Sequence, residues 1–257
     1  MIFDSHAHYD DCAFDKDREK VLAALAGRGV GTVVNVGASL EGTKRTIELT
    51  QKYPFIYGAV GVHPDETGEL NEEMFAWLRE QCRREKIVAV GETGLDYYWD
   101  KENHKVQKKW FIRQLALAKE MSLPVIVHSR EAAADTMEIL KQEYHTQLPA
   151  VIHCYSYSPE MAREYIKMGY FLGIGGVVTF KNAKKLKETV YETPLESLML
   201  ETDCPYLAPE PFRGRRNDSG KLSHVVKAVA EIKGVTPETV IHITEKNAVD
   251  FFGLNRR

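Results

Sequence analysis

The chain has 257 residues, of which 44% are apolar and 28% are charged, and its formal net charge is −3. These values are typical of a globular protein and exclude disordered, collagen-like and fibrous classes. Because the net charge is slightly negative, a surface that is basic throughout is also excluded, and any site for a polyanion has to be local.

Eight short runs of apolar and β-branched residues recur along the chain and predict eight buried strands. Their ends are spaced by about 28 residues, which is the size of one strand–helix unit. In chain order the predicted strands span Ile2–His6, Gly31–Gly37, Ile56–His63, Ile87–Glu92, Pro124–His128, Ala150–His153, Tyr170–Gly175 and Leu198–Asp203.

Helical patterns lie between these strands. Apolar side chains at three- and four-residue spacings predict helices over Asn71–Arg84, His104–Met121 and Glu131–Tyr144. Ser158 followed by Pro159 is typical of a helix N-cap with proline in the first turn. Eight alternating units predict an α/β fold, a closed (β/α)8 barrel that forms a single domain over residues 1–257. An open, doubly wound parallel sheet is the alternative.

Cysteine usage and the N-terminus bear on the location of the protein. The four cysteines form no CxxC pair, which favours reduced thiols over a disulfide framework or a zinc ribbon. No apolar run approaches the roughly 18 residues of a membrane span, so we expect no membrane contact. The first residues lack the basic and apolar regions of a secretory signal, and a cytoplasmic location is expected. With no recognisable apolar seam for self-association, we expect a monomer.

Ligand-type side chains stand at the ends of six of the predicted strands. In a barrel these ends share one face, which is where such enzymes have their sites. Nitrogen and oxygen ligands without thiolates suit zinc, manganese, nickel, iron or magnesium. The side chains concerned are His6 and His8, His63, Glu92, His128, His153 and Asp203.

The spacing of these residues supports shared metal binding. Residues i and i+2 of a strand point to the same side, so His6 and His8 can reach one ion. The two oxygens of Glu92 could bridge two cations. Asp203 could bind a metal and also accept a proton from an attacking water, and Glu201 competes for this assignment.

Each of these residues also has a structural interpretation. Glu92 could form a buried salt bridge, and a single histidine at a strand end is more often a satisfied core residue. His128 and His153 end successive strands at the same mouth, which favours ligands over core packing. Asp96 is interpreted as a residue that orders a loop or supports a ligand, and is not predicted to be a ligand itself.

Six sequence blocks resemble the TatD family of metal-dependent deoxyribonucleases. The resemblance runs from residue 2 to about residue 252, with the blocks in the family's order. They are FDSHAHYD at 3–10, GVHP at 61–64, GETGLD at 91–96, VHSR at 127–130, HCYS at 153–156 and ETDCPYL at 201–207.

This resemblance implies a TIM barrel of the amidohydrolase-like superfamily with two divalent metal ions per chain, which could be Mg, Mn, Zn or Ni. It implies that His6, His8, Glu92 and Asp203 hold one ion, and that Glu92, His128 and His153 hold the other. The carboxylated lysine found in other branches of the superfamily has no candidate here, since Glu92 stands at strand four. The segments at 153–157 and 213–219 depart from the family pattern, which bears on substrate preference.

The function implied is a deoxyribonuclease that cleaves phosphodiester bonds through a metal-activated water, with Asp203 and Glu92 as catalytic residues. We expect cleavage from the ends, including 3′ ends, of single-stranded or frayed DNA. His63, Arg130 and Arg213 are predicted to bind the substrate. Some aromatic residues could stack unpaired bases, although most are expected to pack the barrel rim. The aromatic residues concerned are Tyr97, Tyr98, Trp99, Tyr155, Tyr157, Phe180, Tyr206 and Phe212.

Two other functions stay open. The same ligand set could serve a metal-dependent hydrolase of another bond, such as the ester of a D-aminoacyl-tRNA or a small-molecule amide. The chain could also be a metal-stabilised scaffold without catalysis, although a complete ligand set that includes Asp203 argues against this.

Overall fold

The computed structural model describes residues 1–144 and 148–256 and contains eight parallel strands that neighbour one another in chain order. The strands are β1 (Ile2–Ala7), β2 (Val30–Gly37), β3 (Ile56–Val60), β4 (Ile87–Asp96), β5 (Val125–Arg130), β6 (Ala150–Ile152), β7 (Phe171–Ile174) and β8 (Leu198–Leu200).

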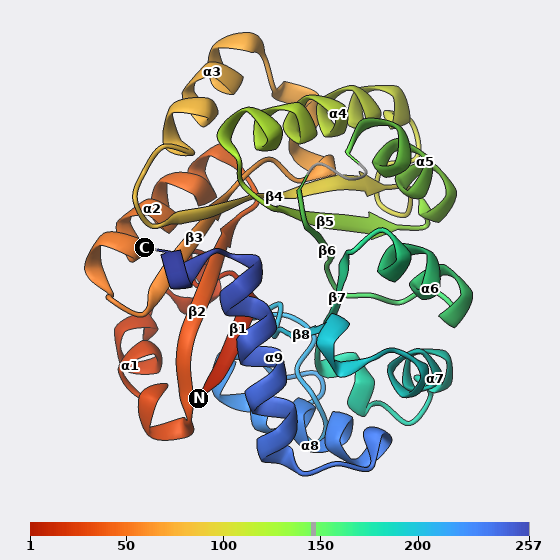
Figure 1. The fold of residues 1–257 in the computed structure, drawn as a ribbon. Coiled ribbons are helices and arrows are strands. Elements are labelled where there is room, and N and C mark those ends of the chain that lie inside the picture. Colours follow the sequence, from red (N-terminus) through yellow and green to blue (C-terminus); the bar gives the residue numbers. More distant parts are fainter. Residues whose placement is uncertain (145–147, 257) are drawn as a thin grey trace.

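Helices surround the strands on the outside, and a final helix crosses one end of the barrel (Figure 1). None of the helices in the described ranges is long and apolar enough to cross a membrane. The helices are α1 (Arg18–Ala23), α2 (Leu40–Lys52), α3 (Glu72–Gln81), α4 (His104–Met121), α5 (Ala133–Glu143), α6 (Pro159–Lys167), α7 (Lys184–Glu192), α8 (Leu222–Lys233) and α9 (Pro237–Phe251).

The barrel closes between β1 and the segment that follows β8. Ala7 forms a parallel bridge with Cys204, and the Asp203 N–H donates to the His6 carbonyl at 2.9 Å. The buried Asp4 carboxylate strengthens this seam, because it accepts hydrogen bonds from the Thr202 hydroxyl at 2.6 Å and from the Thr202 N–H at 3.0 Å. This closure confirms the predicted (β/α)8 barrel and excludes the open sheet.

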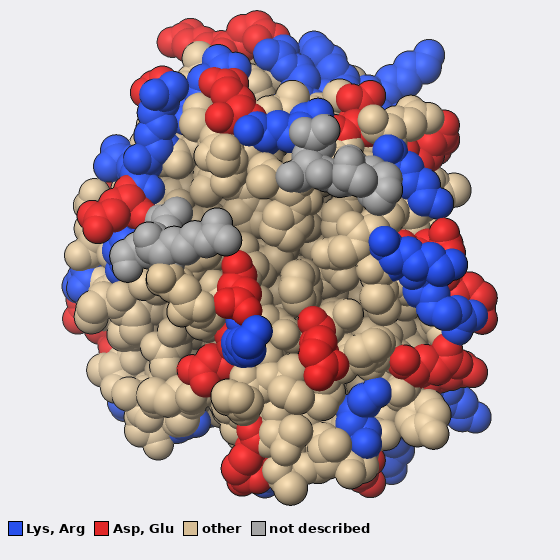
Figure 2. All heavy atoms as spheres, in the orientation of Figure 1, with Lys and Arg blue, Asp and Glu red and all other residues tan. Residues whose placement is uncertain are grey.

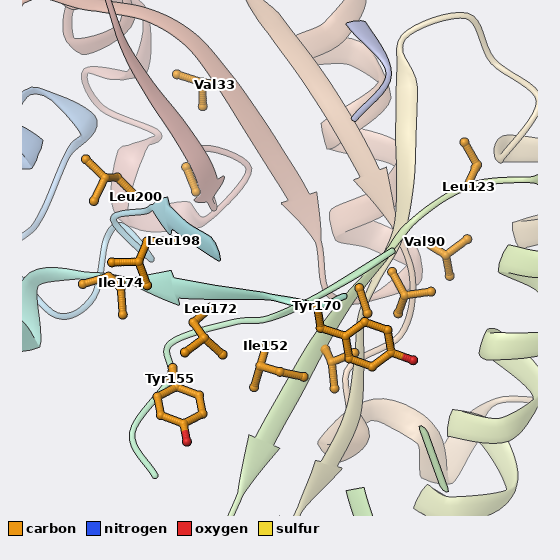
Figure 3. Packing of buried hydrophobic residues seen from close by; sticks show 14 of the residues in the cluster. Val33, Val90, Leu123, Ile152, Tyr155, Tyr170, Leu172, Ile174, Leu198 and Leu200 are labelled. Atoms are coloured by element: carbon orange, nitrogen blue, oxygen red, sulfur yellow. The ribbon is translucent and has the colours of Figure 1, made fainter. Parts of the chain in front are cut away.

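Successive strand residues pack on opposite sides of the barrel wall, as the two-residue period of a strand requires. On β2, Val33 packs outward against the helices, while Val34 belongs to the cluster inside the barrel. Leu198 and Met199 of β8 divide in the same way. The outer cluster, part of which appears in Figure 3, therefore fixes the helices to the strands, and the inner cluster fills the barrel.

Helix α9 covers the amino-terminal end of the barrel. Phe252, which follows α9, stacks on Phe3 of β1 with ring centroids 5.8 Å apart, and Phe251 packs edge-on against Phe171 of β7. All four rings belong to or pack against the inner cluster. Because this end is filled by apolar side chains, polar groups can gather only at the opposite, carboxyl end of the strands.

The predicted elements agree with the structure except at some ends. The predicted helix 104–121 is α4, and the Ser158 hydroxyl caps α6 by accepting the Met161 N–H. The sixth and eighth strands end earlier than predicted, because Cys154 (φ 46°) and Asp203 (φ 55°) adopt left-handed backbone conformations near their ends. Strand β4 continues past Glu92 to Asp96, since the ladder with β5 resumes beyond an irregularity.

Removal of the Phe252 ring from the amino-terminal end of the barrel should destabilise the protein. We expect Phe252→Ala to lower the free energy of unfolding by about 3–5 kcal/mol, because Phe252 is 2% exposed and its loss leaves a cavity at the end of the barrel. Urea unfolding followed by circular dichroism measures the change. Tyr191→Ala, on a side chain that is 68% exposed, is the control and should stay within about 0.5 kcal/mol of the wild type. Equal stability of the two variants would contradict a stabilising role of Phe252 at this end of the barrel.

Candidate metal centre

Two of the predicted ligands enter the mouth because of the period of their strands. Ile126 and Val151 lie in the inner cluster, and residues two positions further along a strand point to the same side. His128 and His153 stand at those positions, so both imidazoles face the barrel axis one layer above the apolar filling. Once the barrel is known, the two-residue period of the strands is enough to predict this position for both histidines.

Glu92 lies at the centre of the site and is only 4% exposed. Its Oε2 atom is 3.2 Å from His6 Nε2 and 3.6 Å from His8 Nε2, while its Oε1 atom is 2.7 Å from His128 Nδ1. His153 Nε2 and His63 Nε2 lie 3.7 Å and 3.8 Å from Oε1. One carboxylate is therefore surrounded by five imidazoles, with its two oxygens directed at different groups of them.

Asp203 completes one side of the cluster. Its Oδ1 atom is 3.3 Å from His8 Nε2 and 3.8 Å from the Nε2 atoms of His6 and His153. The Nε2 atoms of His6 and His8 are themselves 3.1 Å apart. Asp203 has a left-handed φ of 55°, a conformation that costs a non-glycine residue free energy and occurs often at functional sites.

Most of the imidazoles are held from behind through their second nitrogen. His8 Nδ1 donates to the Val36 carbonyl at 2.7 Å, and His128 Nε2 lies 3.0 Å from Asp96 Oδ2. Contacts of this kind orient a histidine and increase its basicity as a ligand. They leave the other ring nitrogen of His8 and of His128 directed at the carboxylates.

Glu201 lies behind His153 as a close charge partner, although His153 Nδ1 has no hydrogen-bond partner among the described residues. The carboxylate is 1% exposed, its Oε1 accepts the Cys154 N–H at 2.6 Å, and it lies 3.1 Å from His153 Nδ1. Glu201 stands two residues after the inward-facing Met199, so the period of β8 could have revealed it. From the sequence alone, Glu201 is only an alternative to Asp203 as a metal ligand or proton acceptor.

Asp96 joins the site to the loop that follows β4. Its Oδ2 contacts His128, and its Oδ1 accepts the N–H groups of Tyr98 and Trp99, each at 2.9 Å. The interpretation of Asp96 as a residue that orders a loop and supports a ligand agrees with both contacts. One buried carboxylate thus positions a histidine of the centre and the backbone of the rim.

The carboxylates favour positive charge on some imidazoles of the cluster, whereas burial and neighbouring imidazoles lower the pKa of His6 and His63. Burial lowers the pKa of an imidazole, but the carboxylates of Glu201, Glu92 and Asp203 outweigh it and raise the pKa of His153 to about 10. The pKa of His8 rises to about 9 for the corresponding reason, with Asp203 as its main partner. Although burial opposes it, the imidazoles hold the pKa of the Glu92 carboxyl well below its usual range.

This donor set fits divalent cations. Histidine nitrogens and carboxylate oxygens without thiolates suit zinc, manganese, nickel, iron or magnesium. The His6 Nδ1 atom is buried without a hydrogen-bond partner among the described residues. Ligand-type atoms lie within 4.8 Å of one another in four overlapping groups, which are His6, His8 and Asp203; His6, His153 and Glu201; His63, Glu92 and His128; and His63, Asp65 and Asp96.

Two of these groups bear on the predicted ligand sets. The first contains three of the four residues expected at one ion, and the third contains Glu92 and His128, expected at the other. The third group also includes His63, which the sequence assigned to substrate binding. The position of His63 is therefore suited to metal binding as well as to substrate contact.

A cavity of about 610 Å³ opens above the cluster at the mouth of the barrel. Seven of its lining side chains are carboxylates, while Arg130 is the one lysine or arginine among them. Arg213 is outside this lining, and its guanidinium lies 4.4 Å from the centre of the Phe180 ring. The lining residues are His8, Asp10, Asp11, Ala38, Ser39, His63, Asp65, Glu66, Glu92, Asp96, Trp99, His128, Arg130, His153, Asp203, Tyr206 and Leu207.

The opposite face of the protein, which carries α9, has a mixed charge. Lysine and arginine side chains alternate with aspartate and glutamate around its rim, and its centre is largely uncharged (Figure 2). The described residues of this face form no continuous basic surface. The face that carries α9 therefore offers no broad site for a polyanion.

Comparison with known proteins gives consistent matches over nearly the whole chain. A family model described as "TatD related DNase" matches residues 3–253. A Bacillus subtilis (strain 168) protein named as the uncharacterized metal-dependent hydrolase YabD is 44% identical over 99% of this chain and 100% of its own length. The 3′-5′ ssDNA/RNA exonuclease TatD of Cronobacter sakazakii is 34% identical over 98% of this chain and 97% of its own.

Solved structures agree with these matches. The crystal structure of the TatD homologue YjjV from Escherichia coli superimposes with a TM-score of 0.93 at 30% identity, and covers 98% of both chains. A phosphotriesterase homology protein from Escherichia coli has a TM-score of 0.73 at 13% identity, which shows a shared fold alone.

The central carboxylate gives a direct test of metal binding. We expect Glu92→Gln to weaken the binding of divalent ions by more than about 100-fold, since even residues behind metal ligands account for 10–100-fold. Metal analysis after gel filtration and calorimetric titration measure the change. Glu66→Gln is the control, because Glu66 lines the same cavity but belongs to none of the four groups. Equal metal content in the two variants would contradict the assignment.

Glu201 allows a subtler test. Glutamine at position 201 can still accept the Cys154 N–H but loses the negative charge next to His153. We therefore expect Glu201→Gln to lower metal affinity by about 10–100-fold while the melting temperature changes little. The control is Glu196→Gln, an exposed position just before β8 at the other end of the barrel. Unchanged metal affinity in Glu201→Gln would restrict Glu201 to a packing role.

Proposed function

The chain belongs to the TatD family of metal-dependent hydrolases, and on that premise we propose that it is a deoxyribonuclease acting on the ends of single-stranded or frayed DNA. The observation that carries this proposal is the position of the histidine–carboxylate cluster at the floor of the cavity in the barrel mouth. The Cronobacter relative is named as a 3′-5′ exonuclease for single-stranded DNA and RNA, which supports the same class of substrate.

The size of the cavity favours an end over a duplex. A volume of about 610 Å³ is in the range of pockets for small ligands, so it suits one nucleotide and the linkage next to it. A duplex presents its phosphates on a wide convex surface, which the rim loops would keep from the floor. An unpaired strand can reach the floor without this obstacle.

Within the proposal, His6, His8, Glu92 and Asp203 hold one divalent ion, and Glu92, His128 and His153 hold the second. When bound, two such ions would supply Lewis acidity to a phosphodiester and to a water molecule. Glu92 serves both sides because its two oxygens already face different imidazoles. The cluster thus combines fixed nitrogen donors with one shared carboxylate.

The remaining roles follow from which side chains reach the cavity. Asp203 lines the cavity, and 16% of its side chain is exposed. We assign to its carboxylate the role of accepting the proton that the attacking water releases. Arg130, the one lysine or arginine in the lining, is assigned to a phosphate of the substrate. His63 is assigned to the substrate or to the second ion, since both lie within its reach.

The acidity of the mouth favours one alternative. Asp10, Asp11, Asp65 and Glu66 line the cavity on the side of the loops that follow β1 and β3. Carboxylates repel additional phosphates but attract an ammonium group. A metal-dependent hydrolase of an aminoacyl ester at the end of an RNA, including a D-aminoacyl-tRNA, is therefore the second candidate.

A nuclease assay separates these activities. Metal-stripped protein is given end-labelled single-stranded DNA with magnesium, manganese or zinc, and we expect a ladder that starts from one end and requires metal. Asp203→Asn should reduce kcat by at least about 100-fold, because general base catalysis contributes 10²–10⁴-fold. Asp250→Asn, on the exposed part of α9, is the control and should retain activity.

The outcome also decides between the two candidates. Absence of DNA cleavage with every metal, while metal analysis still finds bound ions, would overturn the nuclease proposal. Release of amino acid from an aminoacyl ester under the same conditions would then establish the second candidate. A wild-type ladder that Asp203→Asn leaves unchanged would remove Asp203 from the chemistry but keep the nuclease.

A further inference from the structure

Trp99 is an exposed indole at the edge of the predicted active site. It is 66% exposed, although a large aromatic side chain on the surface gives up the free energy of burial. The other two tryptophans lie in the hydrophobic core or pack against it, at positions 77 and 110. Trp99 lines the same cavity as Glu92 and Asp203, so its exposed ring borders the space where a substrate has to lie.

The loop that carries Trp99 is tied to the centre. Asp96 accepts the Trp99 and Tyr98 N–H groups with one oxygen and contacts His128 with the other. Asp96 is 1% exposed, which keeps these bonds from competition with water. The backbone that carries the indole is therefore fixed by hydrogen bonds to Asp96, which also contacts the predicted metal ligand His128.

Arg130 and Tyr98 complete a platform beside the indole. The guanidinium of Arg130 lies 4.1 Å from the centre of the Tyr98 ring and 5.4 Å from that of Trp99. The Tyr98 and Trp99 rings meet edge-to-face with centroids 4.8 Å apart. In this platform of Tyr98, Trp99 and Arg130, the indole and the guanidinium line the cavity, while Tyr98 is outside the lining and packs against both.

Most of the other aromatic residues near the mouth are already engaged in packing. Tyr97 stacks on His104 and donates to Asp135, while the Tyr157 hydroxyl bonds to Ser129. Tyr155 is 2% exposed. Tyr206 is exposed, but its hydroxyl donates to Asp11 on the acidic side of the mouth. Trp99 is thus the aromatic side chain best placed to accept a planar group next to a cation.

The charges around the mouth indicate where a nucleic-acid strand would run. Asp10, Asp11, Asp65 and Glu66 disfavour phosphates along the loops after β1 and β3. Arg130, in contrast, is the last residue of β5 and pairs with Asp96 at the end of β4, next to the loop that carries Trp99. A strand with one phosphate at the centre would keep its next phosphate near Arg130 and bring the attached base to the indole.

From this arrangement we infer that the platform of Tyr98, Trp99 and Arg130 stacks one unpaired nucleobase adjacent to the bond that is cleaved. The inference rests on the proposed nuclease function and adds a binding element to it. Stacking of a base on an aromatic ring tolerates every base but requires that the base be free of a duplex. The platform therefore explains a preference for single strands without any reading of sequence.

The test uses substrates that lack one base. Wild type, Trp99→Ala and Trp99→Phe are assayed on single-stranded DNA that is intact or carries one abasic nucleotide at the first, second or third position from the cleaved end. Base–aromatic stacking corresponds to a factor of about 5 to 140. We expect Trp99→Ala to lower kcat/KM on intact DNA by such a factor, mainly through KM, and Trp99→Phe to retain most of it.

The decisive result is the loss of sensitivity at one position. An abasic nucleotide at the stacked position should slow the wild type by a similar factor and should slow Trp99→Ala no further. Tyr191→Ala, an equally exposed aromatic position on α7, is the control and should behave as the wild type. Binding of fluorescent single-stranded DNA to each variant in the Asp203→Asn background gives a readout that does not depend on turnover.

Failure of this inference differs from failure of the proposed function. If the wild type cleaves DNA but Trp99→Ala loses the same factor as the wild type on every abasic substrate, the platform is overturned and the nuclease remains. If the wild type cleaves no DNA with any divalent ion, the proposed function and the platform are overturned together. Circular dichroism and metal analysis verify that each variant folds and keeps its ions.

Discussion

The structure of the site depends on one constraint, which is the burial of the Glu92 carboxylate. A charged carboxylate that is 4% exposed is stable only if positive charge and hydrogen-bond donors compensate its lost hydration. Five imidazoles lie within 4 Å of its oxygens, and their pKa values respond to it. In the proposed function, divalent cations would meet the same need for positive charge as protons on the histidines.

The barrel leaves one of its two ends for this polar cluster. Apolar residues fill its interior, and α9 covers the amino-terminal end with Phe251 and Phe252. Only the carboxyl end remains for polar groups, and closure at the β1–β8 seam brings His6 next to Asp203. The same carboxylates that support the histidines also anchor the rim, as Asp96 does. Stability and the predicted chemistry are thus divided between the two ends of the molecule.

The sequence allows much of this to be predicted. Alternation of strands and helices gives the barrel, and ligand-type residues at strand ends give the members of the cluster. Strand limits were less predictable, because left-handed conformations at Cys154 and Asp203 leave no distinct signal in the residue types. Glu201 was undervalued since its neighbour along the chain, Asp203, is a ligand type as well. Its contact with His153 comes from another strand and depends on the closed barrel.

By itself the sequence determined the period of the fold, the identity of the donor atoms and their position at the ends of strands, because these follow from local hydrophobic patterns and side-chain chemistry. Only the tertiary structure decided which donors meet and which imidazoles have Asp96 or Glu201 next to their second nitrogen. It also decided which arginine side chains reach the mouth. Arg130 lines the cavity while Arg213 packs on Phe180, although one ends β5 and the other lies in the segment after β8 of the same barrel. The physical reason is that distances between strands and the directions of rim loops arise from closure and packing, which no local stretch of residues encodes.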